Sequence, residues 1–231
     1  MSQLPERIVA VERRIAEAAA RAGRSAEEVR LIAVTKTVPV ERIREAIAAG
    51  LTRFGENRVQ EALPKIDAIG ADVEWHLIGH LQRNKARRAV ERFDWIHSID
   101  SVRLLQRVDR IATELGRSPR LLVQVNTSGE PSKFGVAPEQ VTAILEAAAG
   151  CETVTIDGLM TIGPLTDDRE AIRRAFRLLR TLAEEARGLG SPRVPMTHLS
   201  MGMTADFEIA IEEGATMVRV GSAIFGPRRT T

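Results

Sequence analysis

One lysine follows a short apolar run near the start of this 231-residue chain. Residues 31–34 are all apolar, which is typical of a strand buried on both faces, and Lys36 comes two positions later. Because side chains alternate along a strand, Ile32, Val34 and Lys36 share one face. If that face is the interior, the ammonium lies at the mouth of a core. The residue is then either a solvated lysine or a partly desolvated amine that forms a Schiff base with an aldehyde.

Two turns near the C-terminus have the composition of a phosphate site. Residues 200–204 (Ser-Met-Gly-Met-Thr) and the pair Gly221 and Ser222 each offer a hydroxyl and a glycine that allows close backbone approach. Each turn also leads into an expected helix, whose first N–H groups are free to bind an anion. Ordinary loop chemistry is the alternative interpretation of either turn alone.

Arg219 alternates with Val218 and Val220, so it faces the opposite way from both valines. An inward arginine needs an anionic or hydrogen-bonding partner, and a structural ion pair is the simplest one. A lysine able to form a Schiff base, a phosphate cradle and an arginine are, however, the protein groups that together hold pyridoxal phosphate.

Other chemistry has little support in the sequence. The four histidines occur singly, without the spacing of a zinc site, so we expect no metal centre. No Gly-x-Ser-x-Gly elbow is present, and the chain contains no tyrosine. The histidines are His76, His80, His97 and His198.

The elements that must position these residues alternate regularly along the chain. An amphipathic helix is expected first, over Pro5–Ala22. About eight strands follow, each leading into a helix, which predicts an α/β fold with a single (β/α)8 TIM barrel, an extra N-terminal helix and one domain over residues 1–231. A doubly wound open sheet is the alternative, but the first strand is not followed by Gly-x-Gly-x-x-Gly.

The first expected strand is the one before Lys36. The other expected strands are Thr52–Gly55, Val73–Gly79, Asp94–Ile99, Leu121–Asn126, Thr153–Ile162, Pro195–Ser200 and Thr216–Val220. The expected helices are Val40–Ala49, Glu56–Ile66, a basic helix after the third strand, Val102–Leu115, Pro138–Ala149, Asp168–Arg187 and Ala205–Glu213.

The composition narrows the cellular setting. Apolar residues make up 44% of the chain, but no apolar run is long enough to span a membrane. The polar N-terminus does not resemble a secretory signal, and a single cysteine allows no internal disulfide, so we expect a cytoplasmic protein. We also expect it to be a monomer. With 33 basic and 31 acidic residues the net charge is only +2, and no nucleic acid is expected as a partner. The densest basic patch is interpreted as a solvated helix face; it consists of Arg83, Lys85, Arg87 and Arg88.

Five segments in order resemble the pyridoxal phosphate homeostasis protein family. They are residues 33–36 (Ala-Val-Thr-Lys), 54–57 (Phe-Gly-Glu-Asn), 76–82 (His-Leu-Ile-Gly-His-Leu-Gln), 200–203 and 218–222, and residues 126–135 and 158–161 are similar as well. The resemblance implies the barrel of the alanine racemase N-terminal domain, standing alone. It implies pyridoxal 5′-phosphate (PLP) held as a Schiff base on Lys36 and no established enzyme activity.

The same resemblance assigns the other site residues. Asn57 is expected near the cofactor, and Arg219 is expected to meet the pyridine nitrogen. Ser200, Gly202, Gly221 and Ser222 are expected to hold the phosphate. The implied role is in vitamin B6 homeostasis, with enzymes that lack their PLP as partners.

Two enzymic alternatives remain open at this point. One is a PLP-dependent racemase or decarboxylase on the same barrel, and the other is an aldolase that uses Lys36 directly on a sugar phosphate. A racemase of this fold uses a tyrosine as its second base, which this chain lacks, although His76, His80 and His198 are candidate substitutes. An arginine on the pyridine nitrogen also weakens the ring as an electron sink. We therefore predict no catalytic residue.

Overall fold

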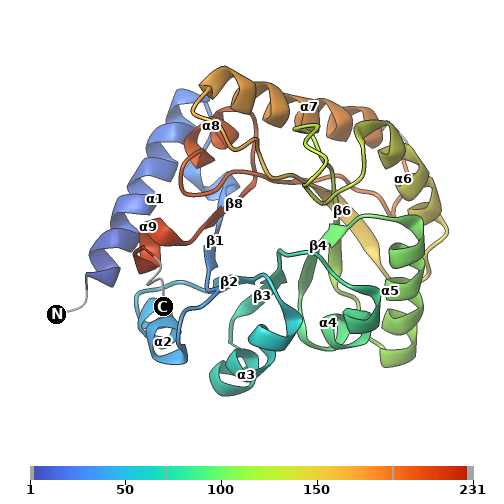
Figure 1. The fold of residues 1–231 in the computed structure, drawn as a ribbon, viewed down its shortest axis with the longest axis horizontal. Helices are drawn as coiled ribbons and strands as arrows, with labels where there is room; N and C mark the ends of the chain where they lie inside the picture. Colours follow the sequence, from blue (N-terminus) through green and yellow to red (C-terminus); the bar gives the residue numbers. More distant parts are fainter. Residues whose placement is uncertain (1–2, 71, 189, 228–231) are drawn as a thin grey trace.

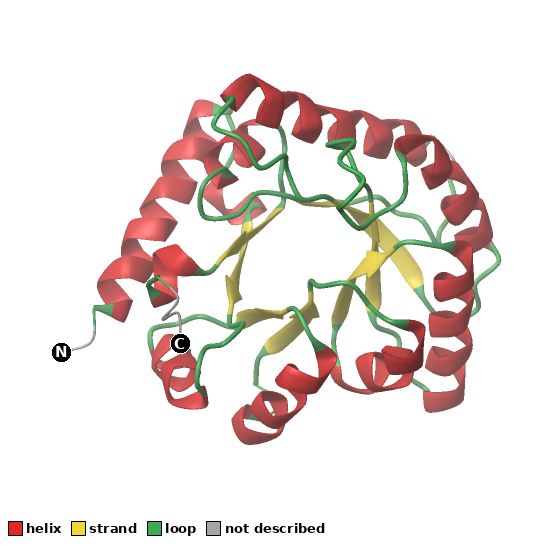
Figure 2. Ribbon diagram, in the orientation of Figure 1, coloured by secondary structure: helices red, strands yellow, loops and turns green. Residues whose placement is uncertain are grey.

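The chain forms a closed barrel of eight parallel strands, with helices around the outside (Figure 1, Figure 2). This computed structural model describes residues 3–70, 72–188 and 190–227. Each strand pairs with its neighbours in sequence, and β8 closes the barrel against β1. The strands are β1 (Arg30–Val34), β2 (Arg53–Glu56), β3 (Glu74–Leu77), β4 (Trp95–Ile99), β5 (Arg120–Gln124), β6 (Thr155–Met160), β7 (His198–Ser200) and β8 (Met217–Val220).

Helices follow the strands and form the outer layer seen in Figure 2. They are α1 (Leu4–Arg21), α2 (Val40–Ala48), α3 (Val59–Ile69), α4 (Ala86–Arg92), α5 (Val102–Leu115), α6 (Val141–Ala149), α7 (Arg169–Arg187), α8 (Phe207–Glu212) and α9 (Ser222–Phe225). Three 3-10 turns are η1 (Ala26–Glu28), η2 (Arg83–Lys85) and η3 (Pro138–Gln140). α1 precedes the first strand in the chain and packs against α8 and α9. The expected extra N-terminal helix is therefore confirmed. None of the helices in the described ranges is long and apolar enough to cross a membrane.

Strand side chains alternate between the barrel interior and the layer beneath the helices. A small interior cluster contains Ile32 and Met217, whereas Val218 and Val220 belong to the larger cluster between strands and helices. Arg219 lies between the two valines and therefore points inward, as the alternation in the sequence predicted. The (β/α)8 fold is confirmed.

The capping residues that the sequence offers define where the longer helices begin. The Ser101 hydroxyl accepts a hydrogen bond from the backbone N–H of Leu104 at 3.3 Å at the start of α5. At the start of α7, Asp168 accepts from the N–H groups of Glu170 and Ala171 at 2.9 and 3.1 Å. Such caps satisfy N–H groups that have no partner inside the helix, so the boundary is set locally.

Two expected boundaries differ around the barrel mouth. The helix expected over Glu56–Ile66 begins instead at Val59, because Glu56 stays in β2 and is paired in register with Leu77 of β3. Lys36 lies in a turn after β1 rather than in the strand itself. The next residue, Thr37, has a φ of 62°, a left-handed conformation in which the chain turns towards α2.

Candidate functional site

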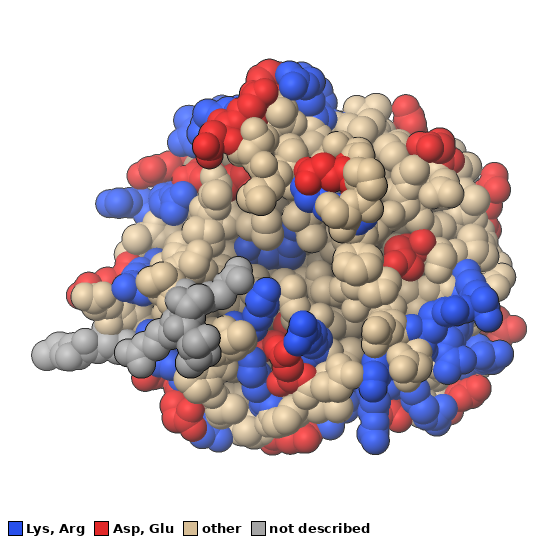
Figure 3. Space-filling view, viewed as in Figure 1, with Lys and Arg blue, Asp and Glu red and all other residues tan. Residues whose placement is uncertain are grey.

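Most of the expected site residues gather at the carboxyl ends of four adjacent strands. Lys36 follows β1, Asn57 follows β2, Gly202 follows β7 and Gly221 follows β8. β1 is paired with both β2 and β8, and β7 is paired with β8, so these four ends are contiguous around the barrel. Figure 3 shows basic side-chain atoms in the hollow at the centre of this face. In barrels of this kind the carboxyl end carries the functional site.

The backbone around Lys36 is held from the outer side of the barrel. The Lys65 ammonium, from α3, donates to the carbonyl oxygen of Thr35 and to Glu56 Oε1, at 2.7 Å in both cases. The Thr35 hydroxyl donates to the same carboxylate oxygen at 2.6 Å. The Glu56 side chain is fully buried, and among the described residues its other oxygen, Oε2, has no hydrogen-bond partner. Buried polar contacts of this kind stabilise one arrangement of the strand end and the turn after it.

The Lys36 side chain itself is half-buried. Within the described ranges its ammonium makes no hydrogen bond or ion pair, in contrast to Lys65 and to Lys133, which is held by Glu130 and the carbonyl of Gly163. An amine that no carboxylate holds is available to react with an aldehyde.

The turns after β7 and β8 meet at the mouth. The hydroxyls of Thr204 and Ser222 lie 3.2 Å apart, which joins the first turn to the first residue of α9. Gly202 has a φ of +90°, and a Cβ added there would lie 2.6 Å from Ala210 Cβ. Only glycine fits this position without displacing α8. Ser222 is exposed, and the first N–H groups of α9 have no partner within the helix.

Arg219 projects into the interior below these turns and is fully buried apart from 3% of its surface. Its Nη1 donates to Ser200 Oγ at 2.7 Å, and its Nη2 donates to the carbonyl oxygen of Thr161 at 2.8 Å. Burial lowers the pKa of Arg219 to about 10, with Asp206 acting in the opposite direction. The group remains a cation at neutral pH, and its two anchors fix the plane of the guanidinium.

The Ser200 hydroxyl begins a chain of side chains that runs through the barrel. Ser200 Oγ lies 3.0 Å from His97 Nδ1, and His97 Nε2 lies 2.9 Å from His76 Nδ1. His76 Nε2 in turn lies 2.9 Å from Glu74 Oε1, near the amino end of β3. We call Arg219, Ser200, His97, His76 and Glu74 the interior relay.

Each hydrogen in the interior relay has one consistent position. Arginine can only donate and an ionised carboxylate can only accept, so Ser200 accepts from Arg219 and His76 donates through Nε2 to Glu74. A neutral His76 then accepts at Nδ1 from His97, and a neutral His97 accepts at Nδ1 from the Ser200 hydroxyl. All the hydrogen bonds run in one direction, from the cation near the mouth to the carboxylate at the opposite end.

The charges of these groups agree with that direction. Burial lowers the pKa of His76, although Glu74 opposes the effect, and burial lowers the pKa of His97 well below its usual value. For Glu74, burial alone would raise the pKa, but the hydrogen bonds from His76 and Trp95, together with the positive charge of Arg53, outweigh it and bring it to about 2. Both imidazoles are therefore neutral and the carboxylate is ionised at pH 7.

The other two histidines have different surroundings. His198 is the first residue of β7, at the amino end of the barrel, where its ring packs edge-on against Trp95. Its pKa is lowered to about 4 by burial and by Arg30 and Arg120. His80 lies after β3, with Nδ1 3.1 Å from Asp100 Oδ2 and its ring stacked on Phe134. Among the residues that the structure describes, no cluster of His, Cys, Asp and Glu could hold a metal ion.

Several of these contacts were not identified from the sequence. The resemblance implies that Ser200 holds the phosphate, whereas in the structure its hydroxyl lies between Arg219 and His97. No role was expected for His97 or Lys65. The inward positions of His76 and His97 could have been found from strand alternation, since each lies two residues from another inward position. Nothing local indicates that Lys65 reaches the end of β1, because that contact joins residues 30 positions apart.

Comparison with known proteins gives a consistent result. The sequence profile described as "Alanine racemase, N-terminal domain" matches residues 8–229. A Pseudomonas aeruginosa protein named pyridoxal phosphate homeostasis protein is 45% identical over 230 residues, covering 99% of this chain and 97% of that protein. The structure of PipY from Synechococcus elongatus without PLP aligns with a TM-score of 0.88 and 45% identity, over 97% of this chain and 100% of that chain. PipY with PLP bound aligns with a TM-score of 0.82 and 47% identity, over 92% and 100% of the respective chains.

Proposed function

This chain belongs to the pyridoxal phosphate homeostasis protein family, and from that premise we propose that it holds PLP as a Schiff base on Lys36 without catalysing turnover. The observation that carries the proposal is the contrast between Lys36 and Lys65. One ammonium is free of partners among the described residues at the barrel mouth, while the other fixes the backbone next to it. PLP is an aldehyde, and such an amine is the protein group that binds it covalently.

The residues around Lys36 fit this cofactor. Ser222, Gly202 and Gly221 lie on contiguous strand ends and offer a hydroxyl and helix-start N–H groups, which are suited to a phosphate. Asn57 follows the adjoining strand β2, and we propose that it lies beside the cofactor. When bound, PLP supplies an electron-withdrawing ring, and we propose that Arg219 donates to its pyridine nitrogen. A permanent donor leaves that nitrogen without a proton, which limits the electron sink.

We assign Ser200 a positioning role towards the cofactor. Its hydroxyl accepts from Arg219 and donates to His97, so both of its strong hydrogen bonds are made inside the protein. A direct contact between Ser200 and the phosphate stays a prediction. Because its hydrogen bonds are made inside the protein, we propose that Ser200 contributes to cofactor binding mainly by orienting the Arg219 guanidinium.

The experiment is reduction of the protein as isolated with borohydride, followed by mass spectrometry of the labelled peptide. The chain has four lysines, so the assignment is unambiguous: we expect the label on Lys36, and none after Lys36→Ala. Lys65→Ala is the matched control, and it should keep the label although it loosens the end of β1. A label on Lys65, Lys85 or Lys133 in the unmodified chain would contradict the site.

The proposal includes the physiological role that the relatives' names indicate. A barrel that holds PLP reversibly buffers it and can release it to enzymes that lack their cofactor. We propose these enzymes as partners of a cytoplasmic monomer, formed by one domain over residues 1–231. Absorbance of the bound cofactor during incubation with such an enzyme measures release directly. Loss of the bound absorbance together with gain of activity in the recipient is the expected result.

A further inference from the structure

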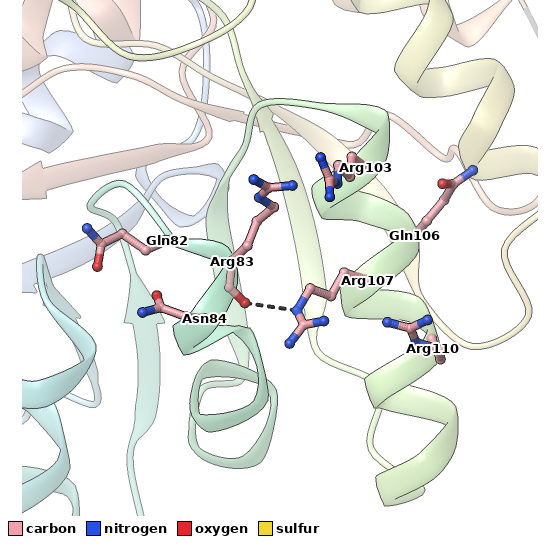
Figure 4. Close-up of a pocket in the computed structure, with 7 residues that line it drawn as sticks. All are labelled: Gln82, Arg83, Asn84, Arg103, Gln106, Arg107 and Arg110. Atoms are coloured by element: carbon pink, nitrogen blue, oxygen red, sulfur yellow. Dashed lines mark hydrogen bonds between the residues drawn. The ribbon is translucent and has the colours of Figure 1, made fainter.

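A groove on the outside of the barrel is lined by four arginines. One wall is the start of η2, with Gln82, Arg83 and Asn84, and the other is a stripe along α5, as Figure 4 shows. The stripe consists of Arg103, Gln106, Arg107 and Arg110, whose spacing places them on one face of the helix. The groove has a volume of about 740 Å³. We call these seven residues the arginine groove.

The residues that line the arginine groove carry four positive charges and no negative one. Within the described ranges, none of the four guanidinium groups forms an ion pair with a carboxylate. On the neighbouring helix α4, by contrast, Arg87 is paired with Glu91 and Glu114, and Arg88 is paired with Glu91. Like charges held close together repel one another, and a bound anion relieves that repulsion.

One of the four arginines is also fixed in place. Arg107 Nε donates to the carbonyl oxygen of Arg83 at 2.9 Å, across the two walls. This contact leaves the two terminal nitrogens of Arg107 available, and it fixes the distance between η2 and α5. In Figure 3, Lys and Arg atoms gather over α4 and α5, on a region separate from the central hollow.

The chemistry of the lining identifies the class of anion. Guanidinium groups match the oxygens of phosphate in bidentate geometry, and the side-chain amides add neutral hydrogen bonds. The stripe from Arg103 to Arg110 extends over about 10 Å of helix, which suits several linked phosphates rather than one. No aromatic or apolar side chain lines the groove, so a nucleobase has no surface on which to stack.

We propose that the arginine groove binds a linear oligophosphate, either inorganic or as the phosphate chain of a nucleoside polyphosphate. The groove lies beside β3 and β4, whereas Lys36 and the expected phosphate turns lie at the ends of β7, β8, β1 and β2. The two sites are separate, so a ligand in the groove does not compete with PLP. The absorbance of bound PLP therefore reports on the other site independently.

The test is calorimetric titration of the whole protein with tripolyphosphate, and in a second arm with ATP. We expect one saturable site for tripolyphosphate. The double variant Arg103→Gln/Arg107→Gln should weaken binding at least about 100-fold, since each charge-assisted hydrogen bond is worth roughly tenfold or more. The matched control is Arg87→Gln/Arg88→Gln, which removes the same charge from α4 and should change affinity less than about threefold.

The two arms distinguish the sources of the phosphate chain. Binding of both ligands supports a nucleoside polyphosphate or an inorganic chain through shared phosphates, and binding of tripolyphosphate alone assigns the inorganic one. Absence of tripolyphosphate binding overturns the proposal, as does an equal loss in both double variants, which would show a general charge effect. Tighter binding of a single-stranded RNA or a polyglutamate peptide, lost on changing Arg103 and Arg107, would also overturn it.

Discussion

Replacing Ser200 by alanine should destabilise the protein without cofactor by several kilocalories per mole. The hydroxyl of Ser200 is fully buried and makes two hydrogen bonds, one from Arg219 at 2.7 Å and one to His97 at 3.0 Å. Alanine removes both at once. It leaves a guanidinium N–H and an imidazole nitrogen unsatisfied in an interior that water does not reach.

The magnitude follows from the two bonds. A hydrogen bond to a charged group contributes about 1.5–3 kcal/mol and a neutral one about 0.5–1.5 kcal/mol, so the expected loss is about 2–4.5 kcal/mol. For a chain of this length, 1 kcal/mol corresponds to roughly 2–4 °C in Tm, so the midpoint should fall by about 4–18 °C. The Ser222 hydroxyl is exposed and has only Thr204 as partner, at 3.2 Å. Ser222→Ala should therefore cost less than about 0.5 kcal/mol.

The assay is thermal unfolding of the PLP-free protein and its two serine variants, followed by titration of each with PLP. We expect Ser200→Ala to lower Tm strongly and Ser222→Ala to leave it nearly unchanged while weakening PLP binding. If both variants unfold at the same temperature as the unmodified chain, the hydrogen bonds of Ser200 in the interior relay do not stabilise the barrel, and the prediction is wrong. A Ser200→Ala protein that unfolds at the normal temperature but no longer binds PLP would instead indicate that the Ser200 hydroxyl contacts the phosphate of PLP.

Three further outcomes are expected. Pyridoxal lacking the phosphate should bind at least about 100-fold more weakly than PLP, because it loses at least two charge-assisted hydrogen bonds at the turns containing Gly202 and Ser222; equal affinities in a titration would remove those turns from the site. Stability should fall as the pH is lowered below about 6.5, since His76, His97 and His198 are neutral when folded and protonate on unfolding. The slope of the unfolding free energy should approach about 4 kcal/mol per pH unit, for three protons. Urea titrations at pH 7, 6 and 5.5 measure this slope, and the same unfolding free energy at all three pH values would contradict the prediction. Incubation of the PLP-loaded protein with L-alanine in deuterated water should give no sustained Cα exchange and no D-isomer, and multiple turnovers abolished by Lys36→Ala would establish a racemase instead.

The fold could be predicted because its determinants are local. The apolar runs, the capping residues Ser101 and Asp168 and the glycines between elements act over a few positions, and the alternation of strand and helix then leaves few architectures. The main boundary error was to begin a helix at Glu56, which the local sequence favours but which contacts with other parts of the chain keep in β2. The bonds from Thr35 and Lys65 to that carboxylate come from other elements, and β2 continues to include it.

The site could be predicted only where the alternation of side chains within one strand determines the position of a residue. Alternation within β8 correctly placed Arg219 inside, because one strand suffices for that inference. The relay from Ser200 to His97 and His76 joins three strands, and their relative heights depend on the register of the closed barrel. The arginine groove likewise joins Arg83 to residues of α5, 20 or more positions away. The basic patch over residues 83–88 was interpreted from the sequence as one solvated helix face. In the structure, Arg87 and Arg88 form ion pairs on α4, whereas Arg83 lines the arginine groove.

The positions of the histidines bear on the proposal that this barrel holds PLP without acting on an amino acid. Racemisation needs a second base on the face of the substrate opposite Lys36. His76 is enclosed in the interior relay with both ring nitrogens bonded, and His198 lies at the far end of the barrel with a pKa of about 4. His80 remains near the mouth, but Asp100 and Phe134 hold its ring. The chain has no tyrosine, so His80 is the one of these histidines placed near the mouth to serve as a second base, and we propose that Lys36 acts alone.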